Sequence, residues 1–322
     1  MNGLIGNTPL IKIDYMYKEK LKSIYVKLEY YNLTGSIKDR MAYYILDKSK
    51  QGGLLKENMP IIEATSGNTG ISFAALGSYY KHPVYIYMPI WASQERIKIM
   101  ESYGAKVFLV SQEEGGFIEC INKADLLSEK LNGFRPNQFS NIDNINVHYE
   151  KTSKEIIDQL KDISVGGFIS GIGTGGTLMG VGKRLKEVDN SIIIAALEPD
   201  KLPILSQGTK YQNHKIEGIG DDFIPDLVDR NFIDKIILIN DDDAVNMARC
   251  ISKYLGIGVG ISSGANMLGA VILQEEINKN VVTIFPDDNK KYLSTDLLKE
   301  IDLNSNFISN QIKLLNYSVI NV

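Results

Sequence analysis

Residues 165–177 read Val-Gly-Gly-Phe-Ile-Ser-Gly-Ile-Gly-Thr-Gly-Gly-Thr, an apolar run that ends in four glycines. Only Ile172 and Thr174 interrupt these glycines, and helical apolar spacing follows over 178–186. Glycine allows a tight turn and a close approach of the backbone to an anion. The free N–H groups and the positive dipole end of the following helix supply donors to that anion. The stretch therefore predicts a strand, a phosphate-binding loop and a helix.

Two phosphate ligands fit this loop by spacing alone. Gly171, Gly173 and Gly176 follow the strand as Gly-x-Gly-x-x-Gly. Glu198 lies about 20 residues further on, as in a dinucleotide-binding fingerprint. Against a dinucleotide, the loop lies past the midpoint of the chain, and Thr177 offers a hydroxyl suited to a compact phosphate monoester. The spacing supports the two ligands about equally.

The composition of the chain points to an enzyme of small molecules. The 322 residues are 44% hydrophobic and 23% charged, with a net charge of −4, which is typical of a soluble globular protein and argues against nucleic acid or an anionic membrane as partner. Cys120 and Cys250 lack disulfide or metal-ligand spacing. The first residues lack a basic segment followed by an apolar core, and no apolar run approaches 18 residues, so we expect neither secretion nor membrane spanning. We expect a cytoplasmic enzyme without a metal site.

Strand-like and helix-like segments alternate along the chain. Strands are expected at 84–88, 106–110, 191–197, 236–239 and 281–285, and helices at 94–103, 116–131, 149–160 and 241–255. This alternation predicts βαβ units, and hence an α/β fold with parallel sheets flanked by helices. The run from 304 to 322 shows no clear periodicity, and its role stays open.

Two more polar loops that contain glycine precede helical patterns. The first, 32–40, reads Asn-Leu-Thr-Gly-Ser-Ile-Lys-Asp-Arg and places Lys38 near a helix start. The second, 63–70, reads Glu-Ala-Thr-Ser-Gly-Asn-Thr-Gly. Each has an ordinary structural alternative, namely a solvated lysine in the first and N-capping by Ser66 or Asn68 in the second. The second loop also suits a carboxylate, through its N–H groups and hydroxyls.

Taken together, these segments resemble the cysteine synthase and cystathionine β-synthase family, enzymes of fold type II that depend on pyridoxal phosphate (PLP). The similar motifs are 32–40, 65–70, 173–177 and 262–265, and the resemblance extends from Ile5-Gly-Asn-Thr-Pro-Leu10 to Tyr292-Leu-Ser-Thr295. Several spaced motifs in one order are more specific than one glycine pattern. The resemblance favours PLP over a dinucleotide.

The resemblance implies a fold like that of tryptophan synthase β, with two open, twisted, mainly parallel sheets. It implies a larger cofactor-binding domain formed by 1–41 plus 145–322, and a smaller mobile substrate-binding domain at 42–144. Substrate carboxylate bound to the smaller domain would draw it over the site. Homodimers are usual in the family, so we expect one here.

The resemblance also assigns roles to individual residues. Lys38 matches the lysine that forms the Schiff base with PLP and moves the Cα proton. Asn68 matches the residue that binds the ring hydroxyl, and Ser262 the residue that faces the pyridine nitrogen. The phosphate is assigned to Gly173, Thr174, Gly175, Gly176 and Thr177. The substrate carboxylate is assigned to Thr65, Ser66, Thr69 and Gln138.

A neutral hydroxyl at Ser262 would not keep the pyridine nitrogen protonated, so the ring would be a weaker electron sink than it is beside a carboxylate. That favours β-elimination and β-replacement on a β-substituted L-amino acid through an α-aminoacrylate intermediate. The resemblance therefore implies a lyase or transferase of cysteine metabolism.

The segment 217–225, Glu-Gly-Ile-Gly-Asp-Asp-Phe-Ile-Pro, departs from the family pattern. Cysteine synthases usually have two small residues where Asp221 and Asp222 stand. Asp222 matches a cystathionine β-synthase pattern and suits a structural carboxylate, whereas Asp221 fits neither pattern. A carboxylate beside the site would repel anionic sulfide and could act as general base toward water. The alternative is a solvated turn aspartate.

From Asp221 we hypothesise that the enzyme converts L-cysteine and water into L-serine and hydrogen sulfide. The main alternative is cysteine synthase, which makes L-cysteine from O-acetylserine and sulfide, and a cystathionine β-synthase-type condensation comes next. An NAD-dependent oxidoreductase is the alternative from a different class. Tyr31, Leu33 and Thr34 also differ from the common Phe-Asn-Pro-Gly-Gly form, with no consequence that the sequence reveals.

Overall fold

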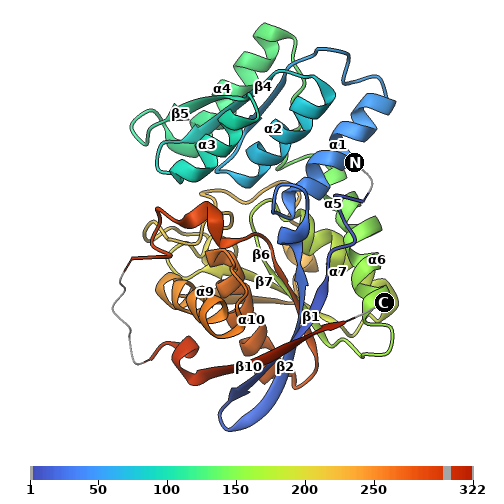
Figure 1. Ribbon diagram of the computed structural model, residues 1–322, viewed down its shortest axis with the longest axis vertical. Coiled ribbons are helices and arrows are strands. Elements are labelled where there is room, and N and C mark those ends of the chain that lie inside the picture. The colour runs from blue at the N-terminus through green and yellow to red at the C-terminus, as the bar shows by residue number, and fades with distance from the viewer. Residues whose placement is uncertain (1–2, 300–305, 321–322) are drawn as a thin grey trace.

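In the computed structural model, which describes residues 3–299 and 306–320, the chain forms a seven-stranded and a three-stranded sheet (Figure 1). The strand orders are β10-β1-β2-β9-β6-β7-β8 and β3-β4-β5. The strands are β1 (Leu10–Tyr17), β2 (Lys20–Leu28), β3 (Ile61–Ala64), β4 (Val84–Pro89), β5 (Lys106–Val110), β6 (Gly167–Gly171), β7 (Ile193–Pro199), β8 (Lys235–Ile239), β9 (Val281–Phe285) and β10 (Ile312–Ile320).

Most strand pairs are parallel, which confirms the predicted α/β class. β2 pairs with β9, β9 with β6, β6 with β7 and β7 with β8, all in parallel, as do β3 with β4 and β4 with β5. Only the pairs that β1 forms with β2 and β10 are antiparallel within the described ranges. The central strand β9, Val-Val-Thr-Ile-Phe, is buried throughout, as expected for a strand covered on both faces.

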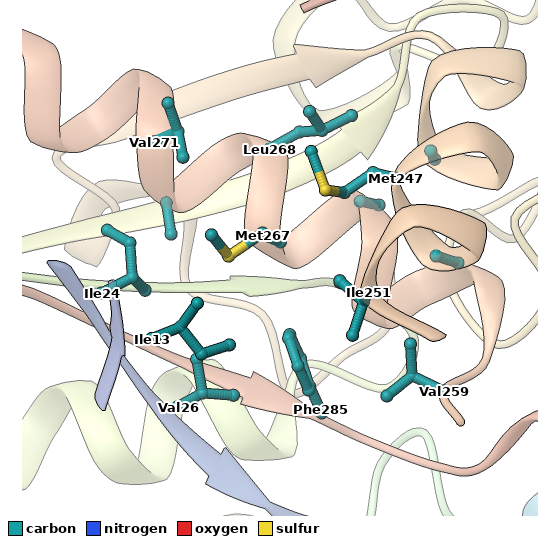
Figure 2. Packing of buried hydrophobic residues seen from close by; sticks show 14 of the residues in the cluster. Ile13, Ile24, Val26, Met247, Ile251, Val259, Met267, Leu268, Val271 and Phe285 are labelled. Carbon is teal, nitrogen blue, oxygen red and sulfur yellow. The ribbon is translucent and has the colours of Figure 1, made fainter. Parts of the chain in front are cut away.

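Helices cover both faces of the seven-stranded sheet. α9 (Asp241–Leu255) and α10 (Ile261–Ile277) pack on one face, and α6 (Ser153–Gln159) and α7 (Gly176–Val188) on the other. Figure 2 shows side chains of the sheet close to Met267 of α10, with Ile251 of α9 nearby. The sheet therefore holds the helix starts of α7 and α10 at fixed positions.

The three-stranded sheet has its own core. α1 (Lys38–Gln51), α2 (Asn68–Tyr80) and α3 (Gln94–Ser102) pack on one face, and α4 (Gly116–Leu131) packs on the other. We call β3–β5 with α2, α3 and α4 the small lobe, which lies at one end of the molecule (Figure 1). The boundaries and the mobility of a smaller domain at 42–144 remain predictions.

Two segments differ from the sequence-based expectation. The predicted helix at 149–160 begins earlier, as α5 (Asp143–Val147), and continues through a π-helical turn at His148–Thr152 into α6. The aperiodic C-terminal run, of which 304, 305, 321 and 322 lie outside the described residues, contributes β10 to the sheet edge. Ile312 and Leu314 of that strand are buried on either side of exposed Lys313, and the apolar and polar residues of 315–319 also alternate, shifted by one position after Leu314.

Short helical segments complete the structure over the described residues. These are α8 (Ile204–Gln207), with single turns at Glu29–Tyr31, Arg230–Phe232, Asn289–Tyr292 and Ile308–Gln311. Across 3–299 and 306–320, no helix has the length and apolar character needed to cross a bilayer. The same residues contain no group of three or more His, Cys, Asp and Glu side chains that could hold a metal ion.

Candidate active site

A cavity of about 800 Å³, counting its open mouth, collects nearly all of the predicted site residues. Its walls come from the starts of α1, α2, α7 and α10 and from the loop at 217–221. The predicted residues that line it are Lys38, Thr65, Ser66, Asn68, Thr69, Gln138, Gly173, Thr174, Gly175, Thr177, Asp221 and Ser262. Gly176 does not line it and begins α7 instead.

The glycines before α7 leave no room for side chains. A Cβ on Gly173 would lie 2.4 Å from the carbonyl oxygen of Gly218, and one on Gly176 would lie 2.1 Å from Asn144 Oδ1. Gly175 has a φ of +84°, and its Cβ would lie 2.5 Å from a methyl of Val228. This turn brings the backbone and the helix N-terminus to the cavity without a side-chain cap. It fits a phosphate group.

Asn144 and His148 contact the hydroxyls of two threonines of this loop. Asn144 Nδ2 donates to Thr174 Oγ1 at 2.8 Å, and His148 Nε2 lies 3.3 Å from Thr177 Oγ1. Burial lowers the pKa of His148 well below its usual range, and the charges of Arg40 and Lys38 act in the same direction. His148 is therefore neutral, and its Nε2–H tautomer would leave the Thr177 hydroxyl free to donate to a phosphate.

Glu198 does not serve as a ribose ligand. It is the second-last residue of β7, is buried, and accepts hydrogen bonds from the backbone N–H groups of Leu205 at 2.8 Å and Ser206 at 3.0 Å. Both carboxylate oxygens are therefore used at the start of α8, and Glu198 is not among the cavity residues. The support that Glu198 gave to a dinucleotide is thus removed.

The loop at 65–69 is not capped in the ordinary way. α2 starts at Asn68, and no side chain caps its N-terminus, so the N-capping interpretation is wrong. The loop is held instead by the Thr65 hydroxyl, which accepts the Gly67 N–H at 2.9 Å. Thr69 Oγ1 donates to Gln138 Oε1 at 2.6 Å, and Gln138 Nε2 donates to the Ala64 carbonyl at 2.8 Å. Open N–H groups and hydroxyls at this helix start suit a carboxylate.

Asn68 is oriented by an aspartate that the sequence interpretation missed. Asn68 Nδ2 donates to Asp287 Oδ2 at 2.7 Å, and Tyr292 OH donates to the same oxygen at 2.7 Å. Asn68 Oδ1 is buried and has no hydrogen-bond partner among the described residues. Asn68 Oδ1 is thus free to accept a hydrogen bond, and the ring hydroxyl of PLP can donate one to it.

Lys38 is not a surface lysine, because it begins α1 and lines the cavity. Burial lowers the pKa of Lys38, although the charges of Asp287 and Asp221 act to raise it. Ser262, at the start of α10, is 4% exposed and lines the same cavity. The site thus contains an amine with a lowered pKa, a phosphate-type loop and a neutral hydroxyl, which together fit PLP.

The two aspartates of 217–225 have different surroundings. Asp222 is exposed and pairs with Lys210, whose Nζ lies 2.6 and 2.7 Å from its two oxygens. Asp221 is half-buried and lines the cavity. Burial raises the pKa of Asp221 to about 7, the charge of Asp222 adds to this, and Lys38 opposes it.

Sequence reasoning missed several residues of the site. Arg96 and Glu217 line the cavity, and Asp287, Asn144 and His148 hold residues that do. Asp287 follows the carboxyl end of β9, where ligand-binding residues gather in parallel sheets, so its position was a usable signal. Arg96 lies inside a helix with no pattern that marks it.

Comparisons with known proteins agree with this site. A family model described as pyridoxal-phosphate dependent enzyme matches residues 1–287. A cysteine synthase of Staphylococcus aureus is 39% identical over 296 residues, which is 91% of this chain and 95% of that protein. The chain belongs to the PLP-dependent enzymes of fold type II and, among them, to the cysteine synthase family. The alternative of an NAD-dependent oxidoreductase is therefore wrong.

Solved structures add relatives with different reactions in their descriptions. A hydrogen sulfide-producing enzyme from Fusobacterium nucleatum is 47% identical, with a TM-score of 0.96 over 99% of this chain and 97% of that one. An aspartate-to-asparagine mutant of a hydrogen sulfide-producing enzyme, complexed with an α-aminoacrylate intermediate, is also 47% identical, with a TM-score of 0.95 over 98% and 97%. A cysteine synthase from Entamoeba histolytica is 37% identical, with a TM-score of 0.85 over 96% and 93%.

Proposed function

We propose that this enzyme converts L-cysteine and water into L-serine and hydrogen sulfide. The observation that carries the proposal is Asp221, a carboxylate in the cavity wall whose pKa is raised to about 7. A group with such a pKa can accept a proton near neutral pH. Support comes from the 47% identical hydrogen sulfide-producing enzyme of Fusobacterium nucleatum. It also comes from the aspartate-to-asparagine mutant of such an enzyme that was solved with an α-aminoacrylate intermediate.

PLP bound in this cavity supplies an electron sink for chemistry at the substrate α- and β-carbons. Glycines and threonines of 173–177 would hold its phosphate, Asn68 its ring hydroxyl, Ser262 its pyridine nitrogen, and Lys38 the covalent link. Thr65, Ser66, Thr69 and Gln138 would bind the substrate carboxylate. Lys38, as the neutral amine that its lowered pKa favours, would take the Cα proton.

Asp221 would decide which nucleophile reaches the β-carbon. The C–S bond breaks and sulfide leaves; water then forms the new C–O bond, while Asp221 takes a proton from that water. A negative Asp221 disfavours the return of an anionic sulfide, because like charges repel strongly in a partly enclosed site. Neutral water meets no such repulsion. The atoms balance as L-cysteine plus water giving L-serine plus hydrogen sulfide.

The test is to incubate the PLP-loaded enzyme with L-cysteine and to quantify sulfide, serine and pyruvate. We expect serine and sulfide in equal amounts. Pyruvate and ammonia in place of serine, or no sulfide at all, would sink the proposal. Asp222→Asn is the matched control for Asp221→Asn, because Asp222 is the neighbouring carboxylate but points to solvent and pairs with Lys210.

Cysteine synthase is the second candidate function, favoured by the 39% identity to curated cysteine synthases. It requires an anionic nucleophile to pass Asp221, so we expect it to be the slower reaction. Comparing kcat/KM for L-cysteine alone with that for O-acetylserine plus sulfide separates the two functions. A higher value for O-acetylserine would favour the second. Homocysteine in place of sulfide tests the condensation to cystathionine in the same assay.

A further inference from the structure

Arg96, on the small lobe, contacts two parts of the cavity wall and two residues behind that wall. It lies on α3 and is 1% exposed. Its Nη1 forms an ion pair with Glu217 Oε2 and also donates to the Ser66 carbonyl at 3.5 Å. Its Nη2 lies 4.0 Å from Asp287 Oδ2, and its guanidinium lies over the Tyr292 ring at 4.6 Å. One side chain thus contacts the loop at 65–69, which we call the carboxylate loop, the loop at 217–221, and the segment 287–292 that follows β9.

The segment that carries Asp221 is attached at both ends. Glu217, four residues before Asp221, is held by Arg96. Phe223, two residues after Asp221, packs on Phe139 with ring centroids 5.0 Å apart and on Phe117 of α4 at 6.3 Å. Arg96 and Phe117 both belong to the small lobe. The position of Asp221 therefore depends on where the small lobe lies.

Arg96 also fills the space beneath the carboxylate loop. A Cβ on Gly67 would lie 2.2 Å from Arg96 Cδ, so loop and side chain are in direct contact. Any shift of residues 65–69 on binding a carboxylate is transmitted to Arg96 because the packing leaves no gap between them. The same guanidinium then passes the shift to Glu217.

We propose that Arg96 is a positioning residue that links occupation of the carboxylate loop to the placement of Asp221. This rests on the proposed function, in which Asp221 activates water. With Arg96 in place, a bound substrate carboxylate fixes Asp221 where it can take a proton from water, and serine forms. Without that link, the three-carbon fragment that remains after sulfide has left is released and hydrolysed. L-Cysteine plus water then gives pyruvate, ammonia and hydrogen sulfide.

The first test measures product partition from L-cysteine. In Arg96→Gln we expect sulfide release within about fivefold of wild type, but a serine-to-pyruvate ratio lowered by about tenfold or more, as expected for a misplaced general base. Glu217→Gln should act alike, and the double variant should be no worse than either single one. Arg249→Gln is the control, because Arg249 also binds backbone carbonyls, those of Leu297 and Asp296, yet does not line the cavity.

The second test uses Trp91, the single tryptophan of the chain, which lies just before α3 and is 55% exposed. L-Alanine has the substrate amine and carboxylate but no β-leaving group. We expect it to change Trp91 emission in the wild-type holoenzyme and in Arg249→Gln, and to change it far less in Arg96→Gln and Glu217→Gln.

A wild-type serine share together with a wild-type Trp91 response in Arg96→Gln would overturn the proposal. If Arg96→Gln does not fold, Glu217→Gln decides the question, since the Glu217 side chain is 25% exposed and glutamine has nearly the same size. Should the wild-type enzyme form no serine, the proposed function fails. The Trp91 response would then still report whether Arg96 transmits occupation of the carboxylate loop.

Discussion

Serine formation should titrate with Asp221. Burial raises the pKa of this carboxyl to about 7, with the charge of Asp222 acting in the same direction and Lys38 acting against it. Only the carboxylate form can accept a proton, and its fraction rises from about 10% at pH 6 to about 90% at pH 8 for such a pKa. We therefore expect the rate of serine formation from L-cysteine to rise about tenfold over this interval.

The assay follows serine and sulfide separately, at saturating L-cysteine and over a pH series. In Asp221→Asn the serine rate should fall by about 100-fold or more, the usual worth of a general base, and should lose its rise near pH 7. Sulfide released in the first turnover should fall far less, because Asp221 acts after the thiol has left.

Asp222→Asn provides the internal check on this reasoning. Removing the charge of Asp222 removes one cause of the raised pKa, so the rise in serine formation should move to lower pH at an almost unchanged maximum rate. An Asp221→Asn variant that keeps both the wild-type rate and the wild-type rise near pH 7 would refute the assignment of Asp221 as the base.

Three further outcomes follow from the structure. Burial would raise the pKa of Glu155, but the hydrogen bonds and the charge of Arg40 hold this pKa at about 2. Glu155→Gln should therefore lower the free energy of unfolding by about 3 kcal/mol at pH 7. Urea titrations should show this difference vanishing as the pH falls from about 4.5 to 2. Gly175→Ala should lower the free energy of unfolding by about 1–3 kcal/mol, because the alanine Cβ would collide with Val228 and the backbone has a φ of +84° there. Absorbance titration should show weaker PLP binding by this variant. Asp221→Asn should stabilise the cofactor-free protein by a few kcal/mol at pH 8 and by nothing below about pH 4. The reason is that the pKa of Asp221 is higher in the folded protein than in the unfolded chain, so ionisation of this carboxyl favours the unfolded chain. Melting curves at both pH values check this.

The parts of the site that depend on local sequence could be predicted. The glycines at 173, 175 and 176 are needed because side chains there would collide with neighbouring groups, and such positions leave a readable pattern. The helix starts that carry Lys38 and Ser262 follow polar, glycine-bearing loops. The parallel sheet follows from buried apolar runs that alternate with helices.

The parts that depend on long-range contacts could not be predicted. Arg96 meets Glu217 across 121 positions of the chain, and Asp287 meets Asn68 across 219. Neither pair has a spacing rule, because tertiary packing alone brings them together. Strand β10 was missed for another reason: its apolar and polar residues alternate, but the alternation slips by one position after Leu314, where the pairing with β1 shifts register. Glu198 was wrongly considered as a ribose ligand because its spacing from the glycines fits a dinucleotide site, whereas in the structure it accepts a backbone hydrogen bond at the start of α8.

Lys38 and Asp221 should behave as one titrating pair. Burial favours the neutral form of each, so the pKa of Lys38 falls and that of Asp221 rises, while each charge favours the ionised form of the other. The neutral pair and the ion pair carry the same net charge and differ only by one proton moved between them. The apparent pKa of serine formation therefore belongs to the pair. It also follows that Asp221→Asn lowers the pKa of Lys38 further, because the amide no longer supports the ammonium. Lys38 would then remain a competent base for the Cα proton at lower pH, which is why loss of Asp221 should affect serine release much more than sulfide release.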